Sequence, residues 1–186
     1  MTATTGSPGA RLAETIEDDE RLDAAVDALS GPARALTSGP GRDLLLGKPL
    51  GHALHPVLTD LPIGFWTSAS VLDLLPVPGG RRASQRLIGL GVLAAVPTAL
   101  TGWAEWAQVT ERPSRRTGVV HAGANGLALV LFAGSWLARR SGRQRGGVVL
   151  GGLGALAASA GGALGGHLAI GKKVGSTFTD GAGSRD

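Results

Sequence analysis

The sequence predicts an all-α, polytopic membrane protein, an antiparallel bundle of four transmembrane helices preceded by an amphipathic helix. Three observations predict this fold. Of the 186 residues, 43% are hydrophobic and only 17% are charged, against about a quarter charged in an ordinary soluble domain. Four apolar runs follow residue 55, each near the ~20 residues that a helix needs to cross a bilayer. About half of the 31 glycines lie inside these apolar runs. A soluble metabolic enzyme is therefore not expected.

The first 48 residues are expected to form a polar tail, an acidic amphipathic helix and a linker. Between Arg11 and Leu29 an acidic run, residues 17–20, lies beside a helical apolar stripe. The stripe consists of Leu22, Ala25, Val26 and Leu29. The helix is expected to pack on a neighbouring element, and a dedicated partner-docking helix is the alternative. Gly31-Pro32 and Gly39-Pro40-Gly41 predict the linker.

The transmembrane domain is expected to span residues 49–173, followed by a polar tail, residues 174–186. Its predicted helices cover residues 56–75, 87–104, 118–138 and 148–170. Nothing alternates as barrel strands do. The short connections predict antiparallel neighbours, with both termini on one side of the membrane. Lys and Arg are nearly balanced between the two sides, so neither side is assigned as cytoplasmic.

Aromatic and glycine positions add detail to this bundle. Three tryptophans fall at predicted helix ends, where rings favour the headgroup layer, namely Trp103, Trp106 and Trp136. Trp66 lies deeper and is expected to pack inside. The last helix carries two overlapping GxxxG pairs, Gly161 with Gly165 and Gly162 with Gly166. Such pairs let helices approach closely. They predict tight packing within the bundle, with a homodimer interface as the alternative.

Four histidines are the main candidates for chemistry. His52 and His55 precede the first transmembrane helix, His121 opens the third and His167 closes the fourth. Antiparallel helices would bring all four imidazoles to one depth at one membrane face. Imidazole is a common ligand of zinc, copper and haem iron, and bundle cores often hold such sites. The alternative is that these rings lie at the interface and merely cap helices or bond to loops.

Our preferred ligand pair is His121 with His167, because they lie on different helices and two opposed imidazoles suit haem b. His52 and His55 would be second ligands or supports. The cofactor would be haem b or a transition metal (Cu, Zn or Fe). The chain has no cysteine, so it carries no cysteine-ligated iron–sulfur cluster.

Three polar residues are expected in the same layer as support. Asp60 lies one turn into the first helix, and Glu105 just follows the second. Asn125 follows His121 by four residues and therefore shares its helix face. Asp60 and Asn125 would orient imidazole N–H groups.

Two other functions remain open. A proton-coupled transporter or channel would use Asp60, Glu105 and the histidines as titrating groups. A scaffold subunit would hold a partner without any ligand. No nucleophile–base arrangement and no HExxH-type signature appear, so an enzyme is not favoured but stays open. The arginines are dispersed over both sides and form no single basic face, so nucleic-acid binding is not expected.

Several motifs together resemble a known family. Gly51-His52-Ala53-Leu54-His55-Pro56 and Asp60-Leu61-Pro62-Ile63-Gly64 are followed, in order, by Glu105-Trp106, by His121 with Asn125, and by Gly165-Gly166-His167. This order resembles a bacterial membrane family catalogued as domain of unknown function 2231, over roughly Arg42 to Gly175.

The resemblance implies a four-helix protein of the bacterial plasma (inner) membrane with no established activity. Some relatives look like fusions to a Rieske-type iron–sulfur domain, which suggests a Rieske-type or other redox protein as partner. Where relatives tend to have His-Gly-Val-Gly, this chain has Lys172-Lys173-Val174-Gly175. No ligand role is therefore expected at that position.

Overall fold

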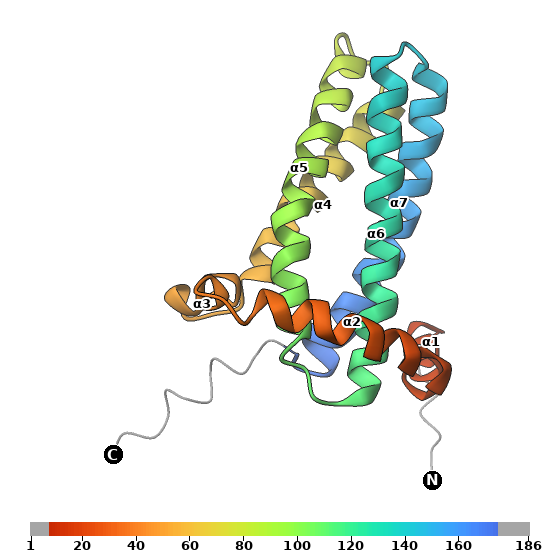
Figure 1. The fold of residues 1–186 in the computed structure, drawn as a ribbon. Coiled ribbons are helices and arrows are strands. Elements are labelled where there is room, and N and C mark those ends of the chain that lie inside the picture. The colour runs from red at the N-terminus through yellow and green to blue at the C-terminus, as the bar shows by residue number, and fades with distance from the viewer. Residues whose placement is uncertain (1–7, 175–186) are drawn as a thin grey trace.

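The computed structural model describes residues 8–174, which form helices and their connections without any strand. Four long helices run side by side, each antiparallel to the next along the chain (Figure 1). They are α4 (Leu54–Leu74), α5 (Gly80–Trp106), α6 (Arg112–Arg140) and α7 (Gln144–Gly166). Helices α5 and α6 begin before and end after their predicted ranges. Helix α7 begins before its predicted range, ends at Gly166 and continues into a π-helical turn, η3 (His167–Gly171).

The four helices are arranged as two hairpins, α4 with α5 and α6 with α7. The hairpins meet where the Trp66 ring of α4 stacks on the Phe132 ring of α6, with centroids 4.2 Å apart. Ile88 and Ala128 are buried beside them. Trp66 is therefore a packing residue, as its depth in the sequence pattern predicted.

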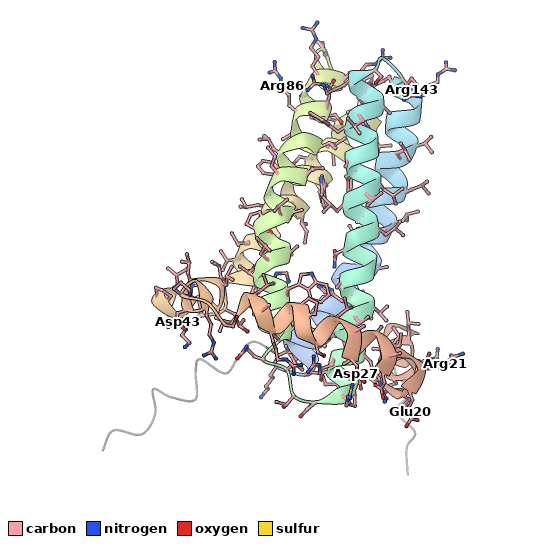
Figure 2. All side chains as sticks on the ribbon, viewed as in Figure 1. Glu20, Arg21, Asp27, Asp43, Arg86 and Arg143 are labelled. Carbon is pink, nitrogen blue, oxygen red and sulfur yellow. The ribbon has the colours of Figure 1, made fainter. Side chains whose placement is uncertain are left out.

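Three of these segments are long and apolar enough to cross a membrane, namely α5, α6 and residues 144–171. Their outer surfaces carry large exposed apolar side chains such as Leu93, Val130 and Leu156. The labelled charged side chains gather at the two ends of the molecule (Figure 2). This distribution suits a protein whose middle contacts lipid. Helix α4 is also apolar over much of its 21 residues. No stretch of 18 residues within it, however, has a mean hydropathy as high as in the other three.

Much of the glycine excess is explained by aromatic neighbours. A Cβ at Gly91 or Gly118 would collide with the ring of Trp66 or Trp106. At Gly154 it would lie 3.0 Å from the Phe132 ring. Because these glycines lack a side chain, large rings from neighbouring helices fit against the backbone.

The N-terminal region departs from the predicted single helix. It forms α1 (Pro8–Asp18), η1 (Glu20–Leu22) and α2 (Asp23–Leu36). Asp19 breaks the helix because its carboxylate accepts the backbone N–H of Arg21. The predicted linker residues Gly31-Pro32 lie inside α2 instead, whereas Gly39-Pro40-Gly41 does precede the next helix.

Tertiary packing explains why α2 continues past its proline. Val26 and Ala33 are buried against Trp106, so the helix gains more from this contact than it loses at the one missing N–H of Pro32. Figure 1 shows α2 lying across one end of the long helices. Two short helices, α3 (Arg42–Leu45) and η2 (Lys48–Leu50), then lead into α4.

Candidate functional site

Two histidines from different hairpins meet at the end of the bundle that α2 covers. His55 lies in the first turn of α4, and His121 lies in the third turn of α6. Their ring centroids are 6.3 Å apart, with the ring planes at 87°. Both residues are partly buried. The structure therefore brings two of the four imidazoles together.

Each ring is fixed by a backbone carbonyl of the adjacent helix in its own hairpin. The Nδ1 atom of His55 lies 2.9 Å from the carbonyl oxygen of Thr98, and that of His121 lies 2.8 Å from the carbonyl oxygen of Gly161. A carbonyl oxygen only accepts, so Nδ1 must donate. In a neutral ring the other nitrogen, Nε2, then keeps its lone pair.

Glycines make room for these rings. A Cβ at Gly102 would lie 2.8 Å from Cε1 of His55, and a Cβ at Gly165 would lie 2.8 Å from Cε1 of His121. A Cβ at Gly161 would lie 2.6 Å from the Asn125 amide nitrogen. Gly161 and Gly165 thus pack inside the bundle, as predicted for one GxxxG pair. Gly162 and Gly166 have no atom of another element within 4 Å of such a Cβ.

Asn125 and Glu105 contact the pair in different ways. The Asn125 amide donates to the carbonyl oxygen of His121 at 2.9 Å, and its nitrogen lies 3.3 Å from both ring nitrogens. A position equidistant from both nitrogens is not in line with the lone pair of either one. Glu105 Oε1 accepts the backbone N–H of His55 at 3.1 Å.

The pairing of His121 with His167 stays a prediction, and the ring contact that the structure shows for His121 is with His55. His167 Nε2 lies 2.7 Å from Glu17 Oε1 of α1, so the N-terminal region occupies the ring nitrogen that a ligand would need. His52 is exposed, with its Nδ1 atom 3.0 Å from the carbonyl oxygen of Ala53. Asp60 is also exposed on α4. Neither residue supports the pair directly.

The described residues do not assemble a multidentate metal site. Between residues 8 and 174 no three His, Cys, Asp or Glu side chains are grouped so that they could hold a metal ion. The donor set offered by the pair is therefore two imidazoles. This set fits axial ligation of haem better than the three or four protein ligands of a zinc centre.

Glu17 is a residue that the sequence pattern placed only in a solvated acidic run. It is 8% exposed, and its second oxygen accepts a hydrogen bond from Lys172 Nζ at 2.8 Å. Burial alone raises the pKa of Glu17, but the hydrogen bonds from Lys172 and His167 outweigh burial and leave the pKa below its ordinary value. Residues from the N-terminal and C-terminal parts of the chain are therefore joined at the end of the bundle that holds His55 and His121.

Arginines at the start of α6 hold α2 in place. Arg116 donates to Asp23 and, at 2.8 Å, to the carbonyl oxygen of Glu17. Arg112 pairs with Asp27 at 2.8 Å, and the Arg115 guanidinium lies 4.3 Å from the Trp106 ring centroid. The hydrogen bond from Arg116 holds the pKa of the Asp23 carboxyl below its ordinary value.

A buried ion pair lies at the opposite end of the bundle. Arg139 Nη1 donates to Asp73 Oδ1 at 2.8 Å, and Ser84 Oγ donates to the same carboxylate oxygen. The Arg139 side chain is fully buried. The sequence predicts that this helix ends at residue 138, whereas α6 extends to Arg140. The sequence could have indicated this pair. Alternating helix directions make α4 and α6 run the same way, which puts Asp73 and Arg139 at one end of the bundle.

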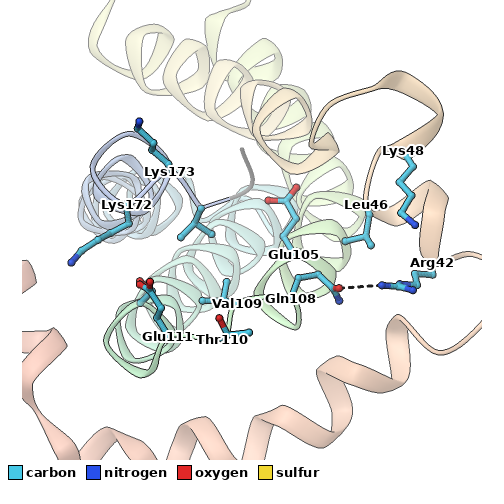
Figure 3. A pocket seen from close by; sticks show the side chains of 12 residues that line it. Arg42, Leu46, Lys48, Glu105, Gln108, Val109, Thr110, Glu111, Lys172 and Lys173 are labelled. Atoms are coloured by element: carbon cyan, nitrogen blue, oxygen red, sulfur yellow. Dashed lines mark hydrogen bonds between the residues drawn. The ribbon is translucent and has the colours of Figure 1, made fainter. Parts of the chain in front are cut away.

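A pocket of about 350 Å³ opens at the histidine end (Figure 3). Glu105 lines it from the end of α5, so one carboxyl group borders both the pocket and the backbone of His55.

Comparison with known proteins identifies the family. The family described as "Predicted membrane protein (DUF2231)" matches residues 51–178, which is more than half of the chain. No curated protein and no solved structure matches. The match contains the histidine pair, all four long helices and most of the charged residues of the pocket. The chain therefore belongs to this family of membrane proteins.

Proposed function

We propose that α4 is a fourth membrane crossing beside α5, α6 and α7. Its ends support this assignment. His55 and Asp73 of α4 are 18 residues apart, and so are His121 and Arg139 of α6, which in a helix corresponds to about 27 Å. The two polar layers are thus separated by nearly the ~30 Å of a hydrocarbon core. Each helix has a histidine at one boundary and a charged residue at the other, so α4 and α6 would span the same depth of the membrane.

We further propose that the His55–His121 pair binds haem b and passes electrons to a redox partner. One observation carries this proposal, namely that both Nδ1 atoms are held by backbone carbonyls while both Nε2 atoms keep their lone pairs. Hydrogen bonding of the distal nitrogen is the usual way in which proteins orient an imidazole ligand and raise its basicity. Bound haem would supply reversible one-electron transfer.

The chain itself would position the two ligands. Thr98 and Gly161 fix the ring orientations, Gly102 and Gly165 allow the close approach, and the Asn125 amide contacts His121. The surrounding apolar helices would exclude water, and a dry, apolar surround is one of the means by which a protein sets a redox potential.

The test is spectroscopic. The protein is purified in mild detergent, its absorption spectrum and metal content are measured, and haemin is titrated into any unloaded fraction. We expect a Soret band that is lost in His55→Ala and in His121→Ala but retained in His52→Ala and His167→Ala. A wild-type protein that takes up no haemin, or four variants that behave alike, would contradict the proposal.

Proton-coupled transport is a second candidate, favoured by the position of Glu105. This residue borders the pocket and contacts His55, so polar groups lead from the pocket to the histidine pair. Proteoliposomes with an internal pH dye distinguish the two functions. Proton flux that stops in Glu105→Gln, in a protein that binds no haemin, would favour transport. Haem binding without flux would exclude it.

A further inference from the structure

The pocket beside Glu105 is built from the segments that flank the long helices. Its lining comes from α3 and η2 before α4, from the α5–α6 connection, and from the chain after η3. Four of its lining residues are cationic and two are carboxylates: Arg42, Lys48, Lys172, Lys173, Glu105 and Glu111. The charged lining therefore carries two more positive than negative charges.

The pocket lies at the depth where the apolar segments stop. Helix α5 ends at Trp106, α6 begins at Arg112, and the apolar segment of α7 ends at Gly171. In a membrane these three points mark the boundary between hydrocarbon and headgroups. Basic pockets between transmembrane helices at this depth are suited to lipid headgroups.

Three of the cations are oriented but not saturated. Arg42 Nη2 donates to Gln108 Oε1 at 3.2 Å, Lys48 pairs with Asp43 at 2.7 Å, and Lys172 donates to Glu17. An ammonium has three N–H donors and a guanidinium has five. Each side chain therefore keeps donors for a further acceptor such as a phosphate oxygen.

Glu105 gives the pocket its second kind of partner. Figure 3 shows its carboxylate pointing into the space between Lys173 on one side and Leu46 with Lys48 on the other. A ligand carrying only negative charge would be repelled by this carboxylate. A ligand carrying both phosphate and ammonium would match the cations and the carboxylate together.

A basic pocket at the other end of the bundle provides a contrast. It is lined by Arg81, Arg143 and Arg145 with Gln144 and two glycines, and no carboxylate is part of its lining. General attraction to acidic lipid would act on both pockets. Selection of a zwitterion would act on the first alone.

We propose that the pocket bordered by Glu105 binds the phosphoethanolamine headgroup of phosphatidylethanolamine. The phosphate oxygens accept from Lys48 and Arg42, and the primary ammonium donates to Glu105. A choline headgroup cannot donate these hydrogen bonds. The proposal does not depend on haem.

The experiment is native mass spectrometry of the detergent-purified full chain. It measures retention of phosphatidylethanolamine, phosphatidylglycerol and phosphatidylcholine, with soluble phosphoethanolamine or inorganic phosphate as competitor. We expect preferential retention of phosphatidylethanolamine and displacement by phosphoethanolamine. Arg42→Gln/Lys48→Gln should lower retention at least about tenfold, since each bond to a charged group is worth ~1.5 kcal/mol or more.

Two further variants separate recognition from general charge and from misfolding. Arg81→Gln/Arg143→Gln removes the same charge at the opposite end and should leave retention unchanged. Glu105→Gln should abolish the preference for phosphatidylethanolamine over phosphatidylglycerol, in a protein whose melting temperature shows that it is folded. Equal losses in the two double variants, equal retention of all three lipids, or binding of inorganic phosphate without lipid would each overturn the proposal.

Discussion

The two ends of the bundle deal with buried polar groups in opposite ways. At one end Arg139 bonds to Asp73, Ser84 and Ser135, and the carboxylate of Asp73 is held by both Arg139 and Ser84. At the other end His55 and His121 each have one nitrogen fixed to a carbonyl oxygen and the second left without such a bond. The closed arrangement pairs its charged groups within the protein, and the open one leaves the Nε2 atoms for the ligand that we propose.

This difference also separates structural from functional signals in the sequence. A charged pair and a histidine pair both lie at helix ends in the same two helices, α4 and α6. The two pairs differ in how many hydrogen-bond partners the neighbouring helices supply to them.

The largest effect is expected at the closed end. Arg139→Ala leaves the buried Asp73 carboxylate without its cation and should cost about 3–5 kcal/mol. Unfolding measured by thermal or denaturant titration in detergent provides the test. The double variant Asp73→Leu/Arg139→Met should recover most of the loss, because it removes both charges. Equal destabilisation of the single and double variants would show that the ion pair is not the cause.

The glycines of α7 offer an adjacent matched pair. Gly161→Ala places a Cβ 2.6 Å from Asn125 and should cost ~1–3 kcal/mol through overpacking. Gly162→Ala meets no such atom and should be neutral or stabilise by up to ~1 kcal/mol, because alanine favours a helix more than glycine does. The same unfolding titration applies. Equal losses at both positions would contradict the assignment of Gly161 to the α6–α7 contact.

Some of this arrangement was predictable from residue pattern alone. Apolar length and short connections predicted the long helices and their antiparallel order, and therefore the common layer of His55 and His121. The docking of α1 was not predictable, because periodicity identifies a buried face but not its partner. Glu17 and His167 are 150 residues apart, and only the folded chain shows that they meet.

Helix α2 illustrates the same limit. Gly31-Pro32 is a common signal for a helix end, but burial of Val26 and Ala33 overrides it. Likewise Arg139 lies within a basic stretch of sequence that suggests solvent. Its burial depends on Asp73, 66 residues earlier.

Acid should weaken the packing of α1 at the end of the bundle that holds the histidine pair. The pKa of Glu17 is held below its ordinary value of 4.5, so its contribution to stability is present above about that pH and is lost as pH falls through the folded value. The protection factors of the α1 amides, which correct for the pH dependence of intrinsic exchange, should therefore fall below pH 4, by an amount of order 1 kcal/mol in opening free energy. Glu17→Gln should show faster exchange at neutral pH and little further change in acid. An unchanged acid response in that variant would assign the effect to another group.

The smallest effect is expected at Asp60. This side chain is exposed on α4 between the two proposed boundaries, so Asp60→Asn, which removes a charge from the membrane-facing surface, should not lower the unfolding free energy. Haemin titration should also be unaffected. A weakened Soret band in this variant would restore the role that sequence alone had suggested for Asp60.

The tautomers of His55 and His121 test the central claim most directly. Nitrogen-15 spectra of the histidine side chains, assigned by comparison with His55→Ala and His121→Ala, report which ring nitrogen carries the proton. We predict that both rings carry it on Nδ1, with Nε2 unprotonated, in the ligand-free protein at neutral pH. Protons on Nε2 in both rings would contradict the account, because the lone pairs would then lie on the Nδ1 atoms, which face the carbonyl oxygens of Thr98 and Gly161 instead of a ligand.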